Sequence, residues 1–197
     1  MSFADDLLDM RIGAFLEHLA TEEPAPAAGS VAALAVAMAA GLCVKAARAS
    51  PEWPEAQSAV AQAERLRRRT APLAQSDAEA YEEALAVLHL PDELEAEVRD
   101  MAIAQVLARA AEIPLVIAEA GADVASLAAL IAERGAADRR AEAVVAAVLA
   151  EAATRSAAYL VGVNLIVTPT DERVVKARAA SEVASAACRN ALESAPT

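Results

Sequence analysis

Aromatic side chains are scarce in this chain of 197 residues, which contains two Phe, two Tyr and one Trp. Hydrophobic residues nevertheless make up 57% of the sequence, and alanine supplies much of that excess. This composition favours closely packed helices over a sheet. The length suits one domain with a sizeable core. We therefore expect an all-α fold in a single domain that spans residues 1–197.

Cysteine and histidine are also rare, with two of each. Cys43 and Cys188 lie in Ala-rich helical pattern rather than at paired spacing, which indicates neither a disulfide framework nor a zinc site. His18 and His89 stand at opposite helix ends without further metal-ligating residues at suitable spacing. We expect no bound metal and no Ser-His-Asp triad, and the cysteine usage predicts a cytoplasmic protein.

Basic residues are too few for a protein that binds nucleic acid. The chain has 17 Lys and Arg residues and 29 Asp and Glu residues, which give a net charge of −12. The densest basic stretch, residues 65–69, is interpreted as a solvated helix face, with a local anion site as the alternative. The first residues show neither the basic region nor the apolar region of an export signal, so we expect none. The apolar run 31–44 is too short for a membrane span, so we expect no membrane partner.

Hydrophobic spacing and helix-breaking residues predict a bundle of six or seven long, partly kinked helices. The predicted segments are 5–19, 30–49, a pattern from the break at 50–54 to 89 with a kink near Pro72, 92–134 with a kink or break at Pro114, 136–159 and 170–192. Residues 161–167 are ambiguous between a helix end and an extended segment. Thr170 is the expected cap of the last helix.

The most informative stretch is Pro24-Ala25-Pro26-Ala27-Ala28-Gly29-Ser30. We expect the two prolines to hold the approach extended, Gly29 to permit a turn that side chains disfavour, and Ser30 to cap the following helix. A helix N-terminus prepared in this way can bind an anion or a polar ligand. The same geometry is also an ordinary way to begin a buried helix.

Asp77 interrupts an apolar stripe, and a carboxylate on a core-facing stripe is costly unless something pairs with it. The stripe consists of Leu66, Leu73, Ala80, Ala84 and Leu88. Tyr81 follows one helical turn later and could hydrogen-bond Asp77 or a shared ligand. Burial would raise the pKa of Asp77 toward the range useful for proton transfer. The alternative is a solvated Asp77 at the edge of the stripe, or one that caps the helix after Pro72.

Two further polar residues lie in apolar surroundings. Glu142 shares a helix face with Val145 and Leu149, but an acidic residue near a helix N-terminus is expected for the macrodipole alone. Asn164 lies in an apolar segment, where its amide needs hydrogen-bond partners. It is either a structural amide at a helix end or a group that orients a ligand.

The stretch from Pro24 to Ser30 resembles a hallmark Pro-Thr-Pro-Gly-Gly-Gly-Ser, with Ala25 in place of Thr and with Ala27 and Ala28 in place of two glycines. That hallmark belongs to the cyclodeaminase/cyclohydrolase family of tetrahydrofolate enzymes. The resemblance extends in the right order over nearly the whole chain, from about residue 15 to residue 171.

Later motifs of the same family are present in altered form. Residues 77–81 are similar to its Asp-Ala-x-Ala-aromatic element, residues 113–115 to its Val-Pro-Leu, and Asn164-Leu165 to its Ile-Asn-Leu segment. A Gly-Asn pair followed six residues on by Ser-Asp is Gly135-Ala136 and Ala141-Glu142 here. The acid is thus retained as Glu142, whereas the asparagine is lost.

The resemblance implies an enzyme of folate one-carbon metabolism that acts on the carbon bridging N5 and N10 of tetrahydrofolate. Hydrolysis of 5,10-methenyltetrahydrofolate to 10-formyltetrahydrofolate is the main expectation, because the chain has no formiminotransferase domain. Formiminotetrahydrofolate cyclodeaminase, an ammonia-lyase, is the alternative. A non-catalytic helical folate-binding or interaction protein with a degenerate site is the competing class. The resemblance implies no cofactor beyond the folate substrate, and a homodimer.

The family resemblance also implies roles for individual residues. Asp77 would be the general acid/base and the carboxylate that stabilises the cation, Tyr81 would position it, and Glu142 would be a weaker catalytic candidate beside the site. The expected substrate-binding residues are Pro26, Gly29, Ser30 and Asn164. Of these, Gly29 and Ser30 would present backbone amides and a hydroxyl to the folate, and Asn164 would orient a polar ring edge.

Overall fold

The computed structural model describes residues 6–89, 96–165 and 170–194, in which all regular secondary structure is helical. The elements are η1 (Leu7–Asp9), α1 (Ile12–Leu19), α2 (Ala28–Arg48), α3 (Ala56–Thr70), α4 (Leu73–Leu88), α5 (Ala96–Ala110), α6 (Glu112–Arg134), η2 (Ala137–Arg139), α7 (Arg140–Asn164) and α8 (Glu172–Glu193). The predicted all-α fold is therefore confirmed. More helices are present than the six or seven predicted, because two predicted long helices are each divided into two.

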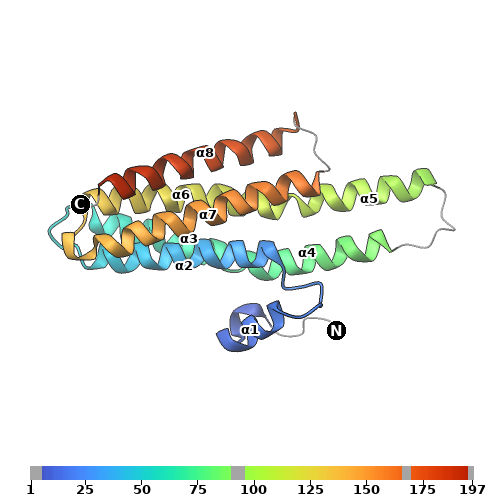
Figure 1. Ribbon diagram of the computed structural model, residues 1–197, viewed down its shortest axis with the longest axis horizontal. Helices are drawn as coiled ribbons and strands as arrows, with labels where there is room; N and C mark the ends of the chain where they lie inside the picture. Colours follow the sequence, from blue (N-terminus) through green and yellow to red (C-terminus); the bar gives the residue numbers. More distant parts are fainter. Residues whose placement is uncertain (1–5, 90–95, 166–169, 195–197) are drawn as a thin grey trace.

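The long helices lie side by side along the longest axis of the molecule, and α4 and α5 extend from one end of the bundle (Figure 1). Helix α6 packs against α7, α8 and α2, and α2 also packs against α7 and α3. Alanine dominates the buried core, which allows the helices to approach closely. One such close approach lies at Gly121 of α6, where an added Cβ would overlap the hydroxyl of Thr154 on α7.

The helix breaks near Pro72 and Pro114 reflect the missing backbone N–H of proline. Helix α3 ends at Thr70, and Pro72 lies directly before α4, where its missing N–H removes no intrahelical hydrogen bond. The break expected at Pro114 lies instead at Ala111. Pro114 occupies the first turn of α6, where helix N–H groups have no intrahelical partner and proline is tolerated.

Two helix starts also differ from the prediction. The segment expected to be one helix over 5–19 is the short turn η1 followed by α1, and Asp6 caps η1 by accepting a hydrogen bond from the backbone N–H of Leu8. Asp171 rather than Thr170 caps α8, because its carboxylate accepts the backbone N–H of Arg173 at 2.9 Å. Of the ambiguous residues 161–167, those up to 164 belong to α7, and 166–167 lie outside the described residues.

Three helical segments are long and apolar enough to cross a membrane by length and composition: Ala28–Arg48, Glu97–Arg134 and Ala137–Asn164. The expectation that the apolar run in α2 is too short for a span is therefore wrong. The helix begins at Ala28 and continues through Lys45 to Arg48, so it has 21 residues. In the bundle, 61% of its apolar window is buried against other helices.

Candidate active site at the start of helix α2

Helix α2 begins at Ala28, so Ser30 lies inside its first turn instead of capping it. The residue at the cap position, Ala27, offers no side-chain acceptor to the amides of the first turn. The fully buried hydroxyl of Ser30 donates a hydrogen bond to the carbonyl oxygen of Ala74 on α4 at 2.8 Å. The expected capping role is thus wrong because the helix starts two residues earlier, and Ser30 joins α2 to α4.

Gly29 is helical, and none of the described glycines has a positive φ, so the expected turn at this residue is wrong. Its missing side chain matters for a different reason. A Cβ at Gly29 would overlap the carboxylate of Asp77, which lies directly against the backbone of α2. Glycine is required here because a neighbouring helix brings a charged group into contact with the main chain.

Asp77 reaches this position from the second turn of α4 and is partly buried. Its carboxylate accepts a hydrogen bond from the backbone N–H of Ser30, and Oδ2 lies 3.4 Å from the Ser30 hydroxyl, whose single proton it shares with the nearer carbonyl oxygen of Ala74. It lies at the positive end of the α2 dipole, among amides without intrahelical partners. Asp77 therefore caps α2. The alternative that it caps the helix after Pro72 is wrong, because Asp77 lies in the second turn of that helix.

Burial raises the pKa of Asp77, and the hydrogen bonds from Ser30 offset only part of that effect. Burial penalises the ionised carboxylate more than the two donors stabilise it. A carboxyl group with a raised pKa releases and accepts a proton closer to neutral pH than an exposed aspartate does. The arrangement at the start of α2 can thus perform proton transfer.

Pro26 and Tyr81 border this arrangement. Pro26 is buried two residues before the start of α2, and the peptide bond that links it to Ala25 is cis. Tyr81 follows Asp77 by one turn on α4, and 43% of it is exposed. The structure therefore brings Pro26, Gly29, Ser30 and Asp77 together, with Tyr81 at the adjoining surface.

Glu142 lies elsewhere. Its carboxylate forms ion pairs with Nζ of Lys45 at 3.1 Å and with the guanidinium of Arg139 at 3.7 Å. Lys45 follows Gly29 by 16 residues of α2, which corresponds to about 24 Å along the helix. The hydrogen bond from Lys45 is the largest of the effects that lower the pKa of Glu142. Within one protomer, Glu142 is an ionised residue at the opposite end of the bundle from Asp77.

Asn164 also has a partner outside this site. Its amide nitrogen donates to the carbonyl oxygen of Ala110 at 2.9 Å, and a guanidinium nitrogen of Arg173 donates to Ala108 at 2.8 Å. Both side chains thus satisfy carbonyls in the last turn of α5, which have no partners within the helix. Of the two alternatives for Asn164, the structure shows the helix-end amide.

Sequence reasoning missed Gln75. Its side-chain oxygen accepts the backbone N–H of Leu7 at 3.1 Å, and its nitrogen donates to Glu79 at 2.9 Å. The bond from Leu7 holds η1 against α4 two residues before Asp77. A contact across 68 residues leaves no periodic signal in a single sequence.

A cavity of about 550 Å³ adjoins the start of α2 and lies between Ala28 and α7. Its α7 lining residues are Ala152, Arg155, Ser156, Tyr159 and Leu160. Arg155 and Tyr159 also line a second cavity of about 440 Å³ that includes residues of α8. These polar groups suit a ligand with an anionic portion. Among the described residues, no group of three or more His, Cys, Asp or Glu side chains could hold a metal ion.

The close approach at Gly29 predicts that Gly29→Ala destabilises the protein by about 1–3 kcal/mol, because the new Cβ must displace the Asp77 carboxylate. Gly41→Ala in the same helix is the matched control, because its Cβ would meet only Cδ of Arg67 at 3.9 Å. Alanine there stabilises the helix by up to about 1 kcal/mol. Urea denaturation followed by circular dichroism measures both free energies of unfolding.

Adding Asp77→Ala to Gly29→Ala should restore part of the lost stability, because the colliding carboxylate is then absent. A Gly29→Ala protein that is as stable as the wild type, or stabilised like Gly41→Ala, would show that Asp77 does not occupy this space.

Comparisons with known proteins agree with the predicted family. The family model described as formiminotransferase-cyclodeaminase matches residues 11–194. A crystal structure of formiminotetrahydrofolate cyclodeaminase from Thermotoga maritima superposes with a TM-score of 0.84 at 20% sequence identity, covering 95% of this chain and 96% of that chain. No curated protein sequence matches significantly. The structural likeness shows a shared all-α fold, and the match over residues 11–194 shows that this chain belongs to the formiminotransferase-cyclodeaminase family.

Proposed function

We propose that this protein is a formiminotetrahydrofolate cyclodeaminase, which closes the formimino group of 5-formiminotetrahydrofolate onto N10 and releases ammonia. The observation that carries the proposal is the carboxylate of Asp77, partly buried and with a raised pKa, at the N-terminus of α2. The family match supports the cyclodeaminase reaction better than the hydrolysis expected from the sequence.

The reaction needs a group that moves one proton. N10 attacks the formimino carbon and forms a tetrahedral adduct, after which the bond from that carbon to the departing nitrogen breaks. The formimino group enters protonated, as an amidinium, so the single proton lost by N10 is the one that the departing nitrogen needs to leave as neutral ammonia, and the positive charge stays on the methenyl product. Asp77 accepts this proton from N10 and donates it to the departing nitrogen. Its carboxylate also stabilises the positive charge of the amidinium carbon. Asp77 thus starts and ends the cycle in the same ionisation state.

Neighbouring residues would either position Asp77 or contact the substrate. Ser30 is fully buried, so its hydroxyl and backbone N–H position the carboxylate instead of touching the folate. This differs from the direct contact expected from the sequence. Arg155 beside Ala28 would face the carboxylates at the tail of the substrate. Tyr81 lies at the exposed rim, where it would contact the substrate and not the buried carboxylate.

The direct test incubates the purified protein with 5-formiminotetrahydrofolate and follows both ammonia release and the methenyltetrahydrofolate absorbance band. We expect enzyme-dependent ammonia release, and Asp77→Asn should lower kcat by a factor of about 10² or more, because the variant loses the proton-transfer group. The matched control is Asp123→Asn, the same change at an exposed position of α6, which should keep wild-type kcat.

Methenyltetrahydrofolate is assayed in parallel, with the spontaneous rate subtracted. Hydrolysis of this compound without ammonia release from the formimino substrate would replace the proposal with the cyclohydrolase reaction. Acceleration of neither reaction would contradict an enzymatic role and support the non-catalytic alternative.

We also propose a homodimer in which helix α1 packs against a second copy of the chain. Helix α1 buries none of its residues within the protomer, and 79% of Ile12 and 58% of Leu16 are exposed. Figure 1 shows α1 apart from the bundle. Helix α2 exposes further apolar surface at Met38, which is 60% exposed. Apolar faces of this kind mark interaction surfaces.

Size-exclusion chromatography with light scattering tests this arrangement. The wild type should have the mass of a dimer, and Ile12→Glu combined with Leu16→Glu should give a monomer that keeps its helical circular dichroism. Glu17→Gln on the same helix is the control and should remain dimeric. A wild-type monomer, or a dimer that survives both charges, would contradict the proposal.

A further inference from the structure

Two neighbouring cavities share part of their lining on α7. The cavity of about 550 Å³ beside Ala28 (the α2–α7 cavity) has Arg155 and Tyr159 in common with the cavity of about 440 Å³ that reaches α8 (the α7–α8 cavity). Their lining on α7 runs from Ala152 to Val163, which is about 16 Å of helix. A ligand that enters beside the start of α2 can therefore extend along α7 as far as α8.

The charged side chains along these two cavities are cationic. Among the described residues that line them, only Arg155 and Arg178 carry a charge. A guanidinium nitrogen of Arg155 lies 3.5 Å from the carboxylate of Glu151, which also accepts the hydroxyl of Ser185 at 3.1 Å. Arg178 on α8 is exposed and forms no ion pair with any described residue. Two guanidinium groups at one cavity favour a ligand with two negative charges.

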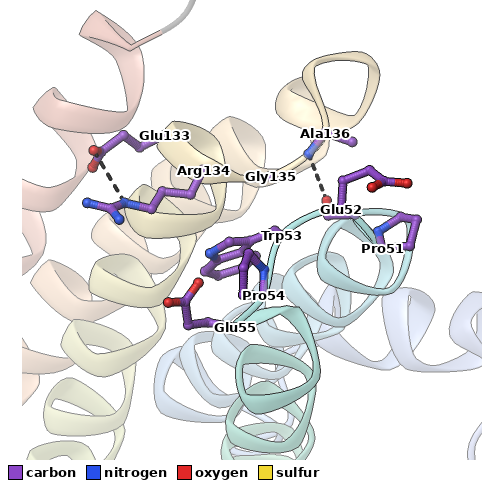
Figure 2. A pocket seen from close by; sticks show the side chains of 10 residues that line it. Pro51, Glu52, Trp53, Pro54, Glu55, Glu133, Arg134, Gly135 and Ala136 are labelled. Carbon is purple, nitrogen blue, oxygen red and sulfur yellow. Dashed lines mark hydrogen bonds and ion pairs between the residues drawn. The ribbon is translucent and has the colours of Figure 1, made fainter.

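Two cavities elsewhere in the bundle have mainly acidic linings. Figure 2 shows the cavity of about 660 Å³ near the end of α6, where Glu52, Glu55 and Glu133 accompany Arg134. The charged lining residues of the cavity between α6 and α8 are Glu133 and Glu193. The chain as a whole has a net charge of −12. An anionic ligand is therefore favoured at the α2–α7 and α7–α8 cavities over these two.

The α7–α8 cavity also offers apolar and aromatic surface. Its apolar lining residues are Ala158, Gly162, Val163 and Val174. Tyr159 lines both cavities, and 73% of this residue is exposed. An exposed aromatic side chain next to an apolar wall suits contact with a second ring. The lining thus combines an aromatic contact with two cations.

We propose that the tail of the folate substrate follows α7 through these two cavities. Tyr159 packs against the aminobenzoyl ring of the tail, Arg155 binds one carboxylate of its glutamate, and Arg178 binds the other. The inference rests on the proposed function for the identity of the ligand. Arg178 then determines the preference for a glutamate tail, and it acts in binding, whereas Asp77 acts in proton transfer.

Titration calorimetry tests Arg178 with two ligands that differ by one carboxylate. The first is 5-formyltetrahydrofolate, a stable relative of the formimino substrate, and the second is the same compound with glycine in place of glutamate. The wild type should bind the glutamate compound about three- to tenfold more tightly. Arg178→Gln should lose this preference, because the additional carboxylate no longer has its partner. Equal affinities of the wild type for the two compounds, or a full preference in Arg178→Gln, would overturn the proposal.

Matched variants separate the contacts. Arg189→Gln removes the same charge from an exposed position of α8 outside both cavities, and it should keep the wild-type preference. Tyr159→Leu should weaken the binding of both compounds about two- to tenfold, because both carry the aminobenzoyl ring. Tyr159→Phe keeps the aromatic ring and should restore the affinity. Loss of the preference in Arg189→Gln as well would show a general effect of charge and would overturn the role of Arg178.

Turnover distinguishes this inference from the proposed function. Arg178→Gln should raise KM for 5-formiminotetrahydrofolate about three- to tenfold and leave kcat within about twofold, because the side chain is remote from the reacting atoms. A wild-type KM in this variant, with normal ammonia release, would overturn the inference and leave the cyclodeaminase reaction intact. Binding that depends on Arg178 without ammonia release would support the tail site and contradict the cyclodeaminase reaction.

Discussion

The contact between the Asp77 carboxylate and the backbone of Gly29 determines how the functional end of this bundle is arranged. It brings α4 against the first turn of α2, where the Ser30 hydroxyl bonds to Ala74 and its N–H to Asp77. The carboxylate supplies the cap that Ala27 lacks. Because the same contact removes the carboxylate from water, one packing feature both completes the helix and raises the pKa of the group proposed to transfer the proton.

This contact also explains which departure from the family hallmark is tolerated. Of the three glycines in that hallmark, this chain replaces the first two with Ala27 and Ala28 and keeps the third as Gly29. Ala28 is exposed and Ala27 is partly exposed, so their methyl groups have space. Gly29 is buried against Asp77, where a methyl group has none. The altered motif therefore keeps the glycine that the geometry of the site requires.

Sequence reasoning predicted the helices well and the contacts between them poorly. The apolar stripe on α4 identified Asp77 as anomalous, and Ala-rich periodicity identified the all-α bundle. The break near Pro114 was misplaced because proline at the start of a helix and proline inside one look alike in a sequence. The partners of Ser30, Asn164 and Glu142 come from distant segments, and a single sequence carries no periodicity that reports them. The length of α2 then separates Glu142 from Asp77, although the family motif suggested a common site.

The pKa of Asp77 tests this account most directly. Carbon NMR of the labelled aspartate side chains, titrated with pH and assigned by comparison with Asp77→Asn, measures it in the folded protein. The account predicts that the pKa of Asp77 lies above the ordinary range of an aspartate, because burial outweighs the hydrogen bonds from Ser30. A pKa of Asp77 at or below the ordinary range of an aspartate would show that the α2 N-terminus stabilises the ionised form. Asp77 would then be a structural cap and not a group that exchanges protons.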